Sequence, residues 1–165
     1  MSAEELATAL TDAAAAWGDA PVEVNVPVTR WKPLAAEDAR NTVGFVRLPS
    51  DHRDLFDDPD AVTHVRDVKQ EIVEVDVEID QNSSLWSGPE RLAALRALLV
   101  HELGHVFGLG HCEAACGDPT ICEPTICEHS VMRPDVLESA KGHYEQVRPS
   151  AADRRCLRRQ LHSER

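Results

Sequence analysis

Residues 101–111 read HELGHVFGLGH, and this stretch decides how the rest of the chain is interpreted. His101 and His105 are four residues apart, so on a helix they project from one face and can bind a single ion. Gly108 allows the backbone to turn sharply at the end of the helix, so that His111 can supply a third nitrogen ligand. Three protein ligands leave one position open, which predicts a catalytic zinc site rather than a structural site closed by four ligands.

Glu102 follows His101 in the same helical turn, but its position does not make it a further ligand of the ion. Its carboxylate is therefore predicted to take a proton from a water molecule on the ion. A short HExxH pattern arises by chance in unrelated helices. The two further fixed positions, Gly108 and His111, make a chance match of the whole motif rare.

A second motif lies downstream, where residues 130–134 read SVMRP. The chain has two methionines and the other is the initiator, so Met132 has no competitor for this position. A long histidine motif followed by a methionine in a tight turn resembles the metzincin metallopeptidases. The Met-x-Pro turn most resembles that of the matrixins, the matrix-metalloprotease-like family. Similar segments at 13–24, 61–80 and 149–153 extend this likeness over nearly the whole chain.

The resemblance implies an enzyme, a zinc-dependent endopeptidase that hydrolyses peptide bonds of proteins with one catalytic Zn²⁺ and with Glu102 as general base. In the family the methionine, here Met132, packs beneath the histidines and is not a ligand. A protein or peptide substrate is expected to lie extended, antiparallel to an edge strand, because backbone pairing orients a peptide without reading its sequence. The residues expected to bind it are Val62, Thr63, His64 and Val65 on that strand and Pro134 after the methionine turn.

Length and composition predict one domain over residues 1–165, with a sheet-bearing half at 1–108 and a half with the cysteine-rich loop and methionine turn at 109–165. The net charge of −12 argues against nucleic acid as a partner. No apolar run approaches the roughly 20 residues of a membrane span. We expect a monomer. The N-terminus shows no signal peptide, so a secreted or extracytoplasmic location is expected from the family and the cysteines alone.

The order of predicted elements is α+β, a metzincin-like catalytic domain. It should have a twisted mixed sheet of about four to five strands, an active-site helix and a C-terminal helix. Helices are predicted over 3–17, from 87–90 onward and over 150–162. Strands are predicted over 22–28, 42–48, 62–66 and 71–80, the last with one acidic face. The active-site helix should bury a stripe of four leucines, namely Leu92, Leu95, Leu99 and Leu103. The exposed face of the closing helix should be formed by four arginines, namely Arg154, Arg155, Arg158 and Arg159.

Five cysteines are the unusual feature, namely Cys112, Cys116, Cys122, Cys127 and Cys156. Disulfides would staple an irregular loop in an oxidising compartment. A second, structural Zn²⁺ would need thiolates, and archaemetzincins, which also place a cysteine after the third histidine, carry such a metal. No Cys-x-x-Cys pair is present, which favours disulfides, and both interpretations stay open.

Two further points concern calcium and an alternative function. The acidic loop at 49–60 is interpreted as solvated, so calcium is not indicated. The domain could also be a zinc-containing module that binds a peptide without cutting it, although the motif keeps all three ligands and the base.

Overall fold

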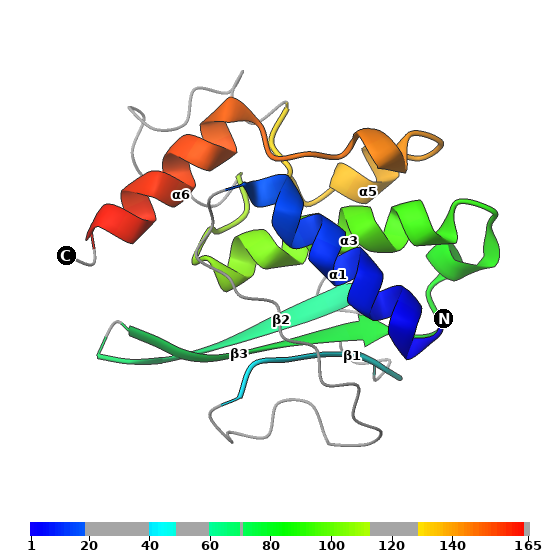
Figure 1. Ribbon diagram of the computed structural model, residues 1–165, viewed down its shortest axis with the longest axis horizontal. Helices are drawn as coiled ribbons and strands as arrows, with labels where there is room; N and C mark the ends of the chain where they lie inside the picture. Colours follow the sequence, from blue (N-terminus) through cyan, green and yellow to red (C-terminus); the bar gives the residue numbers. More distant parts are fainter. Residues whose placement is uncertain (19–39, 49–59, 70, 113–128, 164–165) are drawn as a thin grey trace.

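The computed structural model describes residues 1–18, 40–48, 60–69, 71–112 and 129–163. It confirms the α+β prediction: a small mixed sheet packs against helices that lie on one side of it (Figure 1). Helix α1 covers Ala3–Trp17. It begins with a capping box in which the backbone N–H of Glu5 donates to Ser2 Oγ at 3.1 Å and Ser2 N–H donates to the Glu5 carboxylate at 2.6 Å. These bonds satisfy two donors at the start of the helix, where no helical partner exists.

The sheet has the strand order β1-β3-β2 in the described part of the chain. Strand β1 (Thr42–Val46) runs parallel to β3 (Glu71–Asp80), and β2 (Ala61–Val68) runs antiparallel to β3. The predicted strand at 22–28 lies outside the described residues. Strand β2 is therefore at one edge of the described sheet, as the substrate strand of the sequence prediction should be.

The register divides β3 into two faces. Val75, Val77 and Ile79 are buried, and they alternate with four acidic residues that occupy the opposite face. The alternation did not predict that three of these acidic residues, Glu74, Asp76 and Asp80, would be buried as well.

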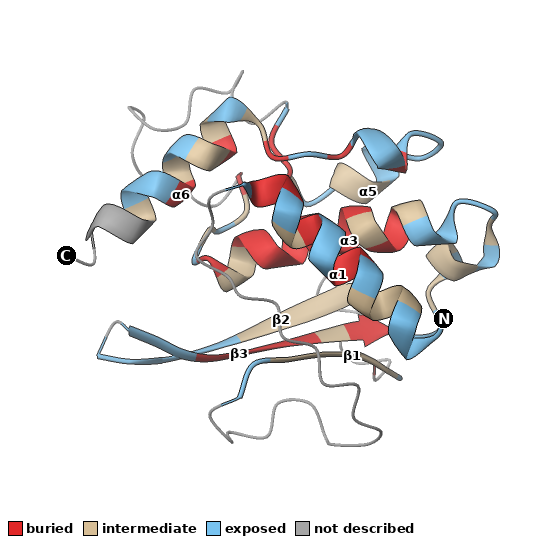
Figure 2. Cartoon of the chain, viewed as in Figure 1, coloured by how far each residue is buried: buried red, intermediate tan, exposed pale blue. Residues whose placement is uncertain are grey.

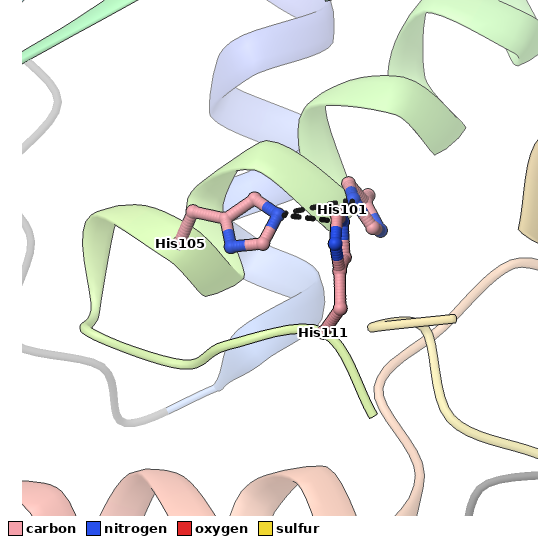
Figure 3. A group of neighbouring side chains, drawn as sticks. All are labelled: His101, His105 and His111. Carbon is pink, nitrogen blue, oxygen red and sulfur yellow. Dashed lines mark hydrogen bonds between the residues drawn. The ribbon is translucent and has the colours of Figure 1, made fainter. Parts of the chain in front are cut away.

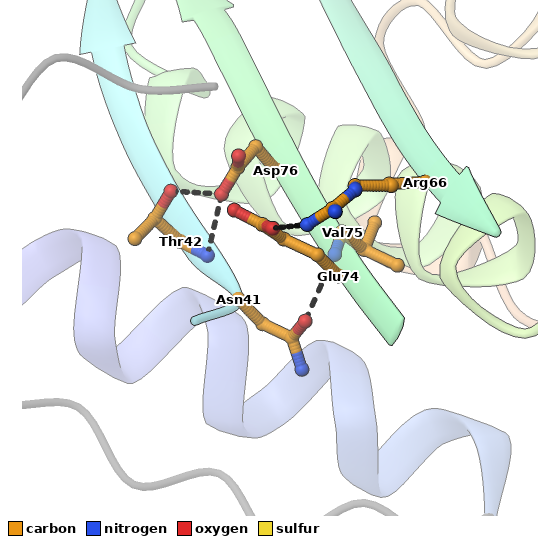
Figure 4. Close-up of polar contacts among 6 residues, drawn as sticks. All are labelled: Asn41, Thr42, Arg66, Glu74, Val75 and Asp76. Carbon is orange, nitrogen blue, oxygen red and sulfur yellow. Dashed lines mark hydrogen bonds and ion pairs between the residues drawn. The ribbon is translucent and has the colours of Figure 1, made fainter. Parts of the chain in front are cut away.

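Neighbouring strands supply partners for two of these buried carboxylates, Glu74 and Asp76, because burying a charge without a partner is costly (Figure 4). Asp76 accepts a hydrogen bond from the backbone N–H of Thr42 at 3.0 Å and another from the Thr42 hydroxyl. Arg66 on β2 lies 3.2 Å from the Glu74 carboxylate, and Asn41 accepts from Val75 N–H at 2.8 Å. This polar layer ties both outer strands to β3.

Helix α3 (Arg91–Val106) runs through the centre of the core (Figure 2). Leu95, Leu99 and Leu103 are buried as predicted, but the prediction for Leu92 is wrong, since 46% of it is exposed. Leu92 lies in the first turn of the helix, at the rim of the core. The helix begins at Arg91, just after the predicted start at 87–90, so Pro89 precedes it.

Trp17 joins α1 to α3. It is 2% exposed, its indole N–H donates to Val100 O at 2.9 Å, and its ring meets Phe107 edge-on at 5.5 Å.

The sequence predicted that Arg154 would lie on the exposed face of the closing helix, and this prediction is wrong. Its guanidinium donates to Ala16 O at 3.0 Å and therefore binds carbonyls at the end of α1.

The remaining described elements are short, apart from the closing helix. A 3₁₀ turn, η1 (Ser84–Ser87), precedes α3. Helix α5 (Val136–Ser139), 3₁₀ turn η2 (Tyr144–Gln146) and helix α6 (Ala151–Ser163) follow the methionine turn. Among the described helices, none combines the length and the apolar character that crossing a membrane requires.

Candidate active site

The end of α3 brings the three motif histidines together. His101 and His105 lie on consecutive turns of α3, and the helix then ends in a Schellman turn. In this turn Gly108 N–H donates to His105 O at 2.9 Å and Leu109 N–H donates to Gly104 O at 3.0 Å. Gly108 has φ +80°, a left-handed conformation that side chains other than glycine rarely adopt. The predicted role of Gly108 in the turn is therefore confirmed.

The Nε2 atoms of His101, His105 and His111 converge on one point, each 3.2 Å from the other two (Figure 3). The opposite ring nitrogens of the two helical histidines are held by backbone carbonyls. His101 Nδ1 lies 2.6 Å from Val131 O, and His105 Nδ1 lies 2.8 Å from Leu109 O. A carbonyl can only accept a hydrogen bond, so both Nδ1 atoms carry protons and both Nε2 atoms present lone pairs to the common point.

This donor set fits a zinc ion. Zn–N distances of about 2.0–2.1 Å in a tetrahedral site place ligand nitrogens about 3.3–3.4 Å apart, close to the separations found here. Lone pairs directed at one another repel, and a cation between them removes that repulsion. Among the described side chains, the three histidines form a group that could hold a metal ion.

Burial keeps the helical histidines neutral. It lowers the pKa of His101 to about 4, with Val131 O opposing the shift. Burial likewise lowers the pKa of His105, although the nearby Glu102 carboxylate partly offsets the effect. A neutral imidazole is the form that binds metals, so both side chains are in the ligand form at neutral pH.

Glu102 is buried beside the histidines and makes one contact that the sequence did not predict. The Thr63 hydroxyl on β2 donates a hydrogen bond to Glu102 Oε2. Burial raises the pKa of the Glu102 carboxyl, while the Thr63 hydroxyl and His105 favour its charged form. No local sequence signal could have revealed this contact, since it joins residues of a strand and a helix that only the fold brings together.

Met132 lies under the active-site helix. It is 3% exposed, and its sulfur packs against Gly104 and near Trp17. Cys112 N–H donates to Met132 O at 3.0 Å, which links the segment after His111 to the methionine turn. Met132 thus lies against the histidine-bearing helix.

A buried carboxylate on the closing helix holds the methionine turn. Asp153 accepts hydrogen bonds from the Ser130 hydroxyl at 2.5 Å and from Val131 N–H at 3.2 Å. It also caps α6, accepting from Ser150 N–H at 2.7 Å while its own N–H donates to Ser150 Oγ at 3.1 Å. The Ser-x-x-Asp spacing signals such a cap, but sequence analysis did not connect Asp153 to the active site.

The residues predicted to bind substrate are divided between two faces of β2. Thr63 pairs with Val77 and so shares the face that packs on α3, whereas Val62 and His64 lie on the face of the acidic residues. His64 is drawn into that layer, with Nε2 3.2 Å from the Glu78 carboxylate. Val65 is exposed on β2, and Pro134 is exposed after the methionine turn.

The structure describes two of the five cysteines. Cys112 is buried directly after His111, and Cys156 is half-buried on α6. Cys116, Cys122 and Cys127 lie outside the described residues.

Comparison with known proteins agrees with this geometry. The matrixin family model, of the M10 peptidases, matches residues 1–125, a span that includes α1, the sheet and the three histidines. No curated protein sequence matches the chain. No solved structure matches it either. Matrixins are zinc metallopeptidases, and the histidine triad provides the metal site that this activity needs. The chain therefore belongs to the matrixin family of zinc metallopeptidases.

Proposed function

We propose that this chain is a zinc-dependent endopeptidase that cuts peptide bonds within proteins. One observation carries the proposal: three imidazole Nε2 atoms lie 3.2 Å apart beside the buried carboxylate of Glu102. A peptide-binding module would need the metal cage but would not need a carboxylate there. No other side chain at the described site suggests a different reaction.

A zinc ion held by His101, His105 and His111 would supply a Lewis acid that polarises the scissile carbonyl and makes water more acidic. Glu102 takes a proton from the attacking water as the water oxygen forms a bond to the carbonyl carbon. The same proton then moves from Glu102 to the peptide nitrogen as the carbon–nitrogen bond breaks. The products are an amine and a carboxylic acid, which gives up its remaining proton to solvent to become a carboxylate, and Glu102 returns to its ionised state.

The substrate is proposed to bind extended, antiparallel to β2. The position of β2 at one edge of the described sheet supports this arrangement, since an edge strand offers backbone groups to an added strand. Residues 62–65 would pair with the substrate, and Pro134 and the segment after it would border the pocket on the leaving side. The substrate backbone would thereby be placed across the end of α3, where Glu102 lies.

The cysteines are proposed to form disulfides rather than a second zinc site, and the protein is proposed to act in a secreted or extracytoplasmic location. A disulfide bond at Cys112 in the structure supports both statements, because disulfides persist in oxidising compartments. We propose a single catalytic domain that acts as a monomer.

The test is cleavage of a mixed peptide library by the purified, zinc-loaded protein. Glu102→Ala should keep its zinc but lose nearly all turnover, and treatment with a chelator should abolish cleavage until zinc is restored. Glu4→Gln, at an exposed carboxylate on α1, is the matched control and should cut like the wild type. Retained cleavage in Glu102→Ala would overturn the role of Glu102, and a folded, zinc-loaded wild type that cuts nothing would favour the binding module.

A further inference from the structure

Thr63 connects the edge strand of the sheet to the base. Its backbone belongs to β2, the strand proposed to bind the substrate, and its hydroxyl donates to Glu102 Oε2 on α3. The register explains why this residue makes the contact. Thr63 is paired with Val77, whose buried side chain identifies the face of the sheet that packs on α3. Val62 and His64 lie on the other face and cannot reach the carboxylate.

The contact engages one oxygen of the carboxylate. Within the described part of the chain, Glu102 Oε1 accepts no hydrogen bond, whereas Oε2 accepts from Thr63. A glutamate side chain has three rotatable bonds, and fixing them costs up to about 2 kcal/mol of rotamer entropy. Threonine is stiff at χ1 because it is β-branched, so a hydroxyl on a paired strand is a well-defined anchor for such a side chain.

We propose that Thr63 is a positioning residue: by holding Oε2, it directs Oε1 of Glu102 toward the water that attacks the peptide. This inference rests on the proposed function and adds a further residue to it. Thr63 belongs to the strand beside the substrate, so β2 positions both the peptide backbone and the carboxylate of Glu102. A displacement of β2 relative to α3 would move both together.

The chemistry of the side chain makes the proposal specific. Valine has the shape of threonine but no hydroxyl, so Thr63→Val removes the hydrogen bond and keeps the packing. Serine keeps the hydroxyl and lacks only a methyl group, so Thr63→Ser should restore the contact. A purely structural role for Thr63 predicts the reverse order, in which valine is tolerated better than serine.

The experiment compares wild type, Thr63→Val and Thr63→Ser in their zinc-loaded forms. Steady-state cleavage of one peptide gives kcat and KM. Calorimetry with the same peptide, its scissile amide reduced to CH₂–NH, gives a dissociation constant that needs no turnover. Zinc content is measured on each protein. Thr11→Val, which removes an exposed hydroxyl that donates to Ala7 O on α1, is the matched control.

We expect Thr63→Val to lower kcat by about 10- to 100-fold, since misplacing a catalytic group has effects of this order. KM, the dissociation constant and zinc content should stay within about twofold of wild type, and Thr63→Ser should recover kcat to within about threefold. An unchanged kcat in Thr63→Val, a loss confined to KM, or a serine variant as slow as the valine variant would each overturn the role of Thr63. Absence of cleavage by the wild type would instead overturn the proposed endopeptidase, and this inference with it.

Discussion

A Cβ atom at residue 104 would lie 2.1 Å from the sulfur of Met132, so glycine is required where the methionine turn meets the active-site helix. The atoms in the way are the terminal sulfur and methyl group of Met132, and Trp17 closes the other side at 3.2 Å. Both side chains are buried, so Met132 has little room to move aside. The close approach of Met132 to α3 explains why this helix carries a glycine between His101 and His105.

Gly104→Ala should lower the free energy of unfolding by about 1–3 kcal/mol, the usual cost of overpacking a core, despite the better helix propensity of alanine. Chemical denaturation of the metal-free protein measures the change. Gly88→Ala is the matched control, because a Cβ atom there meets only Glu90 N at 4.0 Å. Equal stability of the two variants would show that Met132 yields to the added methyl group.

The stability of the metal-free protein should fall as the pH drops from about 6.5 to about 4. His101 has a pKa of about 4 in the folded protein because it is buried, against 6.5 for the ordinary side chain. The unfolded chain therefore binds more protons in this interval, and unfolding becomes easier as acid is added. A pKa difference of about 2.5 corresponds to a loss of roughly 3 kcal/mol in the free energy of unfolding once the pH is below both pKa values.

Urea denaturation between pH 7 and pH 4.5, in the presence of a chelator, measures this dependence. His101→Gln should show a shallower loss of stability over the same interval, since glutamine does not titrate. Identical pH profiles for the variant and the wild type would contradict the assignment to His101.

Asp153→Ala should destabilise the protein by about 2–4 kcal/mol. The substitution leaves the Ser130 hydroxyl, Val131 N–H and Ser150 N–H without their acceptor, and unpaired buried donors each cost about 1–3 kcal/mol. Thermal or chemical unfolding gives the value. Asp135→Ala provides the comparison, because the ion pair of Asp135 with Arg133 is exposed and should contribute less than about 1 kcal/mol. Similar losses of stability in both variants would show that Asp153 does not anchor the methionine turn.

Arg154→Ala should cost about 1–2 kcal/mol, because its guanidinium binds the carbonyls of Ala16 and Trp17 at the end of α1. Arg158→Ala changes an exposed arginine on the same helix and should be nearly neutral. Unfolding midpoints of the two variants in urea distinguish these outcomes. A neutral Arg154→Ala would mean that water replaces the guanidinium at no cost.

Local patterns in the sequence were enough to predict much of this structure. The helix predicted over 3–17 corresponds to α1, the alternation at 71–80 to β3, and the spacing of His101, His105 and His111 to the group that could hold a metal. Each of these signals lies within a few residues, where the geometry of a helix, strand or turn is fixed by the backbone.

Contacts between distant segments were not predictable in the same way. The hydroxyl of Thr63 reaches Glu102, and Asp153 holds the turn of Met132, only because the fold brings these segments together. The burial of Glu74 and Asp76 likewise depends on Arg66 and Thr42, which lie on other strands. The exposure of Leu92 follows from where the core ends, which the helical spacing does not encode.

The hydrogen bond from His101 to Val131 O has a consequence for the order in which the molecule is assembled. Val131 is itself held by Asp153 on α6, so the carbonyl that orients His101 is fixed only after the closing helix has docked. During synthesis the ribosome releases residues 101–111 well before residue 153. A growing chain can therefore form the histidine-bearing helix while its first metal ligand still rotates freely. Full assembly of the metal site therefore waits for the closing helix, so the three histidines reach their final geometry only after the last element of the domain has folded.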